Sequence, residues 1–142
     1  MTLSTLGPIH HVGYVVPDLD VAIAEIDRTL GVAIEAREVL AEQDVEAVML
    51  TAGSGHVELI TPRDPEGAIA RFMDKRGPGL HHIAFEVADI EAALEDLRLR
   101  GVELIDQTAR RGLGGHLVAF IHPRSALGVL TEIVQADHPP AG

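Results

Sequence analysis

The chain of 142 residues contains no cysteine. This absence excludes disulfide bonds, thiolate metal sites and a cysteine nucleophile. It also agrees with a cytoplasmic location, which we expect for this protein, because disulfides are rare in that compartment.

Positive charge and aromatic side chains are also scarce. The chain has 11 basic against 22 acidic residues, a net charge of -11, and Lys75 is its single lysine. A nucleic-acid-binding protein needs a basic surface, and it commonly stacks bases on aromatic rings. With only 3% aromatic residues, the sequence gives no reason to expect a nucleic-acid partner.

Long hydrophobic runs are missing, because charged residues or glycine interrupt every apolar stretch. We therefore expect no membrane-spanning helix. Hydrophobic residues make up 46% and charged residues 23% of the chain, which is typical of a globular protein. The length fits one domain with its own core.

The sequence does contain an internal repeat. The segment "IHHVGYVVPDL", which begins at Ile9, recurs as "LHHIAFEVADI" from Leu80, at a spacing of 71 residues. A repeat of this length indicates two copies of one structural unit. Each copy opens with a pair of adjacent histidines, which are His10 and His11 in the first copy and His81 and His82 in the second.

Each copy continues with the same predicted elements. Asp18 and Asp89 are suited to cap a helix, apolar residues follow them at helical spacing, and Gly31 and Gly101 end the two helices. Three strand-like segments follow each helix: residues 32–38, 45–52 and 56–61 in the first copy, and residues 102–106, 116–122 and 129–135 in the second.

These patterns predict an α+β fold of two βαβββ modules within a single domain spanning residues 1–142. The first module covers about residues 9–62, a helical linker covers 63–78, and the second module covers about 79–135. A lone module would leave one face of its sheet open, so we expect the two to pack side by side and form a concave mixed sheet.

The adjacent histidines must point to opposite faces of their strands. His10 and His81 alternate with bulky apolar residues, so we expect them to be structural. His11 and His82 are each followed, two positions on, by glycine or alanine, which leaves room beside the imidazole. A single strand histidine is usually a satisfied structural residue, but the duplication favours a shared site for this pair.

The last strand of each copy carries one acid in an apolar run, namely Glu58 and Glu132, which are 74 residues apart. An unpaired carboxylate is costly in such a place, although Glu58 alone could also face solvent. With His11 and His82 they form a set of two imidazoles and two carboxylates. Such a set suits a divalent ion such as cobalt, manganese, nickel or zinc.

The chain resembles a known family across residues 9–135. The matching motifs are "IHHVG", "AEQDV", "GLHHIAFEVADIEAAL" and "HPRSALGVLTEIVQ". They are similar to the vicinal oxygen chelate superfamily (glyoxalase, bleomycin resistance protein and dioxygenase), and within it to the methylmalonyl-CoA epimerase family. The family pattern puts its metal ligands on the same four residues: His11, Glu58, His82 and Glu132.

The resemblance implies an epimerase of a 2-alkylmalonyl-CoA thioester, with methylmalonyl-CoA as the first candidate. Such an enzyme removes the α-proton through a metal-stabilised enolate. One divalent ion at the centre of the fold is implied, Co2+ first and Mn2+, Ni2+, Zn2+ or Mg2+ as alternatives. An acyl-CoA substrate, a homodimer and no membrane partner are also implied.

The resemblance implies further roles as well. Glu132 is the first candidate for proton transfer and Glu46 the second. Some family members carry a glutamate where this chain has Ala47, and Glu46, next to it, faces the opposite side. Arg124, Gly114 and Gly115 are candidates to bind the CoA phosphates, because arginine and glycine amides suit that ligand.

Other activities remain open from the sequence. The same scaffold could serve a lyase of the glyoxalase I type, a small dioxygenase or a metal-free protein that binds small molecules. A dioxygenase normally uses two histidines and one carboxylate, so the fourth donor counts against it. The presence of four potential ligands at equivalent positions of the two copies also counts against a metal-free protein.

Overall fold

The computed structural model describes residues 6–136. These residues form two compact units. The first unit comprises residues 11–81, and the second comprises residues 6–10 together with 82–136. Both boundaries fall inside a duplicated motif, between the two histidines of each pair.

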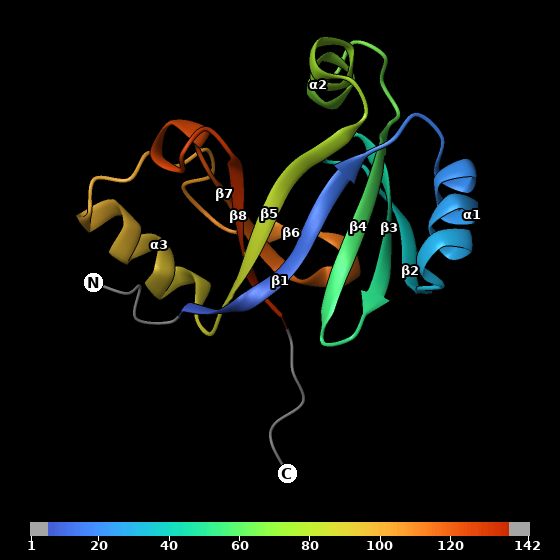
Figure 1. The fold of residues 1–142 in the computed structure, drawn as a ribbon. Helices are drawn as coiled ribbons and strands as arrows, with labels where there is room; N and C mark the ends of the chain where they lie inside the picture. The colour runs from blue at the N-terminus through green and yellow to red at the C-terminus, as the bar shows by residue number, and fades with distance from the viewer. Residues whose placement is uncertain (1–5, 137–142) are drawn as a thin grey trace. The chain divides into compact units, whose positions relative to one another are not determined.

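The first unit contains the first copy of the repeat (Figure 1). Strand β1 (Leu6–Val15), of which the last five residues belong here, pairs in parallel with β4 (Gly55–Pro62). Strands β4, β3 (Val45–Ala52) and β2 (Ala33–Leu40) pair antiparallel in that order. The helices of this unit are α1 (Leu19–Leu30) and α2 (Ala68–Arg76).

The second unit repeats this arrangement. Strand β5 (Gly79–Val87), of which the residues from His82 onward belong here, pairs in parallel with β8 (Leu130–Gln135). Antiparallel pairing continues to β7 (Leu117–Ile121) and β6 (Arg110–Arg111). Helix α3 (Ile90–Leu99) follows β5, and two short 3-10 turns occupy Leu113–Gly115 and Pro123–Ser125.

One predicted strand is wrong. Residues 102–106 form a single isolated bridge, between Leu104 and Ile121, and the two-residue β6 takes the outer position instead. The amides of Ile105 and Asp106 both donate to the carbonyl of Phe120, and the Asp106 carboxylate accepts the Phe120 amide at 2.8 Å. A side chain therefore replaces a ladder partner, which prevents regular pairing.

The helices begin and pack as predicted. The carboxylate of Asp18 accepts the Val21 amide at 3.0 Å, and that of Asp89 accepts the Ala92 amide at 3.1 Å, so both act as N-caps. Gly31 ends α1 with a positive φ of 66°, which favours glycine. The apolar side of α1 packs on Val48, Leu50 and Leu59, and that of α3 on Ala119, Ile121 and Ile133.

The strand order is β2-β3-β4-β1 in the first half and β5-β8-β7-β6 in the second. Because the β1–β4 and β5–β8 pairs are parallel and the others named are antiparallel, each half has mixed strand pairing. The predicted α+β class with two βαβββ halves is confirmed. Within residues 6–136, none of the helices has the length and apolar character needed to cross a bilayer.

Candidate metal-binding site

In the second unit, His82 and Glu132 lie on the face of the sheet opposite α3. A small apolar cluster on that face contains Ala84, Val118 and Val134. His82 is two residues from Ala84 and Glu132 is two residues from Val134, so both side chains point to this side. One ligand atom of His82 and one of Glu132 lie within 4.8 Å of each other.

In the first unit, Glu58 lies on the face opposite α1. Its neighbours Val57 and Leu59 pack against that helix, so the alternation of β4 turns Glu58 away from it. His11 belongs to the adjacent parallel strand, and Gly13, two residues on, is paired with Glu58. Registered partners and residues two apart share a face, so His11 and Glu58 also share this face.

The two units use the same register. Gly13 pairs with Glu58 in the first unit, and Ala84 pairs with Glu132 in the second. Each pair joins the acid to the small residue that follows the candidate histidine by two positions. The repeat is therefore structural as well as sequential, down to the strand partner of each carboxylate.

The four side chains are almost fully buried. The exposed fractions are 3% for His11, 8% for Glu58, 4% for His82 and 6% for Glu132. Burying a carboxylate is costly unless polar groups or a metal ion compensate for the lost hydration. Each unit thus holds one buried imidazole and one buried carboxylate on the same face, and groups of these two kinds are common ligands of divalent metal ions.

The other histidine of each pair packs against a ring in its own unit. The ring of His10 lies 5.7 Å from that of His116, and the ring of His81 lies 4.7 Å from that of Phe72 in α2. Both contacts are edge-on, an arrangement that stabilises aromatic packing.

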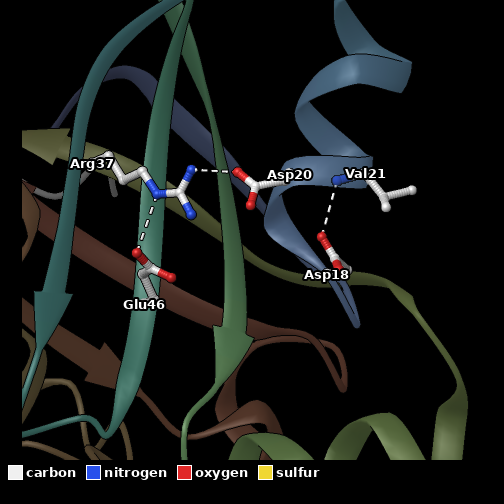
Figure 2. A network of polar contacts seen from close by, with 5 residues as sticks. All are labelled: Asp18, Asp20, Val21, Arg37 and Glu46. Carbon is white, nitrogen blue, oxygen red and sulfur yellow. Dashed lines mark hydrogen bonds and ion pairs between the residues drawn. The ribbon is translucent and has the colours of Figure 1, made fainter.

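Glu46 lies in an ion-pair network on the α1 side of the first unit (Figure 2). The Nε of Arg37 donates to Glu46 at 3.1 Å, and its Nη1 donates to Asp20 of α1 at 2.8 Å. The hydrogen bonds that Arg37 donates to these two carboxylates, Asp20 first, raise the pKa of Arg37. Because Met49 pairs with Glu58 and Ala47 lies two residues from Met49, Ala47 shares the Glu58 face and Glu46 does not.

The sequence reasoning gave no role to His56, which precedes Glu58 by two residues on β4 and shares its face. Its Nδ1 lies 2.9 Å from Oε2 of Glu35, and the Thr51 hydroxyl donates to the same carboxylate at 3.2 Å. The carboxylate therefore lies within ion-pair distance of one ring nitrogen of His56. The sequence "HVE" at residues 56–58 could have indicated the shared face, because residues two apart on a strand share a face.

The residues predicted to bind CoA phosphates lie in the two turns of the second unit. The side chain of Arg124 is 74% exposed, with Nη2 at 3.6 Å from the Glu103 carboxylate. Gly114 and Gly115 have positive φ angles of 75° and 80°. The Gly115 amide donates to the Gly112 carbonyl at 3.0 Å, so it already serves the turn.

Comparison with known proteins gives a family for this fold. Residues 10–120 match the model of the glyoxalase/bleomycin resistance protein/dioxygenase superfamily. The match covers most of the chain and includes one histidine of the candidate set from each unit.

Curated relatives and a solved structure agree with this match. The mitochondrial methylmalonyl-CoA epimerase of Homo sapiens is 36% identical over 92% of this chain and 75% of its own length. The ethylmalonyl-CoA/methylmalonyl-CoA epimerase of Cereibacter sphaeroides is 33% identical over 92% of this chain and 98% of its own length. A variant of Streptomyces coelicolor methylmalonyl-CoA epimerase, in complex with 2-nitronate-propionyl-CoA, superposes with a TM-score of 0.90 at 34% identity, covering 97% of this chain and all of that one.

Proposed function

The chain belongs to the glyoxalase/bleomycin resistance protein/dioxygenase superfamily, and we propose that it is an epimerase of 2-alkylmalonyl-CoA thioesters, methylmalonyl-CoA first. The observation that carries the proposal is the buried histidine–glutamate pair, held in the same strand register in both units. Relatives named as methylmalonyl-CoA epimerases support the choice of reaction.

We infer that His11, Glu58, His82 and Glu132 bind one divalent metal ion, with Co2+ as the first candidate and Mn2+, Ni2+, Zn2+ or Mg2+ as alternatives. Two neutral imidazoles and two carboxylates suit ions of intermediate hardness. When bound, the ion would supply positive charge to the substrate oxygens while C2 loses its proton. The apolar residues beside each pair would exclude water and strengthen this electrostatic effect.

Epimerisation needs proton transfer on both sides of C2. Glu132 remains our first proton-transfer candidate, acting from the second unit. For the other side we propose His56 in place of Glu46, because His56 shares the Glu58 face and its ring lies within ion-pair distance of Glu35. The Glu46 carboxylate is paired with Arg37 on the α1 side, and Ala47 has no ionisable group.

The test is exchange of the C2 hydrogen of methylmalonyl-CoA with deuterium oxide, followed by mass spectrometry. We expect exchange and racemisation with metal-loaded protein, loss of both after chelation, and recovery after the metal is added back. A loaded protein that gives no exchange with either methylmalonyl-CoA or ethylmalonyl-CoA would rule out the epimerase. In that case, conversion of the hemithioacetal of glutathione and methylglyoxal would test the lyase alternative.

Three expectations from the sequence belong to the same proposal. Arg124, Gly114 and Gly115 stay candidates for contact with the CoA phosphates. A homodimer and a cytoplasmic location stay predictions, which size-exclusion chromatography with light scattering and cell fractionation would check.

A further inference from the structure

We propose that Arg110 binds the free carboxylate of the 2-alkylmalonyl group and so selects malonyl-type thioesters over neutral acyl thioesters. This inference rests on the proposed function, since it names a specificity residue of the same site. With a net charge of -11, the protein repels an anionic acyl group at long range, and a local cation in addition to the proposed metal ion would offset this repulsion.

Arg110 lies on the same face of the second unit as His82 and Glu132. It pairs with Val118 across β6 and β7, and Val118 belongs to the apolar cluster opposite α3. Directly paired residues of an antiparallel ladder share a face. The arginine is therefore directed to the side that carries both candidate ligands of this unit.

A chain of ring contacts joins Arg110 to the candidate ligand His82. The guanidinium carbon of Arg110 lies 5.6 Å from the centre of the Phe120 ring. The Phe120 ring in turn meets the His82 ring edge-on at 5.8 Å. The guanidinium is thus two ring contacts from an imidazole that we assign to the metal, on the same face of the unit.

One edge of the guanidinium faces Asp106. Its buried Nε lies 3.6 Å from Oδ1 of that residue, within ion-pair distance but too far for a hydrogen bond, while the other oxygen of the carboxylate accepts the Phe120 amide at 2.8 Å. Asp106 is thereby fixed to the backbone of β7, and the Phe120 ring supports the guanidinium plane. Within residues 6–136, Asp106 is the one carboxylate that pairs with Arg110, which leaves its Nη groups to receive a ligand oxygen.

The surroundings favour a carboxylate of the acyl group over a phosphate of CoA. The side chain of Arg110 is 32% exposed, whereas that of Arg124 is 74% exposed. A planar guanidinium forms two parallel hydrogen bonds with a carboxylate, and these are stronger where water is partly excluded. The phosphates of CoA are heavily hydrated and better suited to the exposed turns.

Binding of malonyl-CoA and acetyl-CoA, measured by calorimetry on metal-loaded protein, tests the inference without turnover. These two thioesters have the same CoA portion and differ in the free carboxylate. We expect Arg110→Gln to weaken malonyl-CoA binding by about tenfold to a hundredfold, the loss typical of a charge-assisted bond. Acetyl-CoA binding should change by less than about twofold, which also shows that the variant is folded.

Two further variants sharpen the test. Arg110→Lys keeps the positive charge but lacks the paired N–H donors of the guanidinium. It should therefore retain part of the preference for malonyl-CoA that Arg110→Gln loses. Arg76→Gln is the matched control, because Arg76 also lies over a phenylalanine ring, Phe72, at 5.7 Å on the exposed helix α2. It should leave both affinities unchanged.

The outcomes separate the inference from the proposed function. If Arg110→Gln weakened the binding of malonyl-CoA and acetyl-CoA equally, Arg110 would be assigned to the CoA portion and the inference would be overturned. Unchanged affinity for both thioesters would also overturn the inference. The wild-type protein could give no C2 exchange and still prefer malonyl-CoA, while Arg110→Gln abolishes that preference. In that case the epimerase proposal would fail and the inference would stand. If the wild type exchanged C2 normally and Arg110→Gln kept the preference, only the inference would fail.

Discussion

The two units present a carboxylate in the same strand register but surround it with different side chains. The antiparallel neighbour of Glu58 in the first unit is Met49, and that of Glu132 in the second unit is Phe120. Beyond these neighbours, the second unit adds a cation, Arg110, and the first adds an imidazole beside a carboxylate, His56 with Glu35. The duplication therefore keeps the histidine and the glutamate in the same register, while the side chains around them differ between the two units.

The largest effect should come from removing one imidazole in either unit. We expect His11→Ala and His82→Ala each to lower the rate of C2 exchange by at least about a hundredfold to a thousandfold, as loss of an electrostatic stabiliser does. Both should also lower bound metal, as measured by elemental analysis. Equal losses would support one ion served by both units.

The matched controls for these variants are the adjacent histidines. His10→Ala and His81→Ala remove ring contacts with His116 and Phe72, so they should lower thermal stability and leave the metal content intact. If His81→Ala depleted the metal and His82→Ala did not, the assignment of faces would be reversed.

The next effect separates the two acid–base candidates of the first unit. His56→Ala should slow C2 exchange by about a hundredfold, as loss of a general acid or base does. Glu46→Gln should stay within about twofold, because its carboxylate pairs with Arg37 on the other face. Steady-state racemisation measures both, and a large loss confined to Glu46→Gln would contradict the assignment to His56.

A third comparison concerns the two cores. Leu50 under α1 and Leu94 in α3 are both fully buried. Substitution of either by alanine should cost about 2–5 kcal/mol of unfolding free energy, because it removes apolar contacts and leaves a cavity. Urea denaturation followed by circular dichroism measures the loss, and strongly unequal values would indicate that one unit adapts more readily to a cavity.

The smallest effect should come from the helix caps. Asp18→Ala and Asp89→Ala each remove one bond to a first-turn amide, at a cost of about 1 kcal/mol. Asp→Asn at the same positions should retain most of the stability, because asparagine also caps helices. The same denaturation experiment measures these losses. If the asparagine variant were as unstable as the alanine variant, the stabilisation would come from the charge of the aspartate and not from its hydrogen bond.

Local patterns made much of the fold predictable from sequence. The caps, the helix periods and the alternation of β1, β4, β5 and β8 depend on neighbours a few residues apart, and the structure follows them. The failure at residues 102–106 has a non-local cause. It depends on a bond between Asp106 and the Phe120 amide, 14 residues away, which no pattern within the segment reveals.

The candidate site was predictable from sequence only where it depends on strand alternation and on the repeat. Alternation and the repeat spacing identified the faces of His11, Glu58, His82 and Glu132, because both are properties of the strands themselves. The pairing of Arg37 with Glu46, and of His56 with Glu35, depends on how strand β2 lies against its neighbours. The position of Arg110 likewise depends on a two-residue strand that composition alone does not indicate.

The length of the two-residue turn at Gly53 and Ser54, which joins β3 to β4, limits which insertions and deletions homologues can tolerate. Gly53 has a φ of 63°, and the turn aligns Ala52 with Gly55. Loss or gain of one residue there would slide β4 by one step and turn Glu58 toward α1, since side chains alternate along a strand. A homologue could thus retain all four candidate ligands in a sequence alignment and still lose the site through a single deletion in the hairpin that carries Glu58.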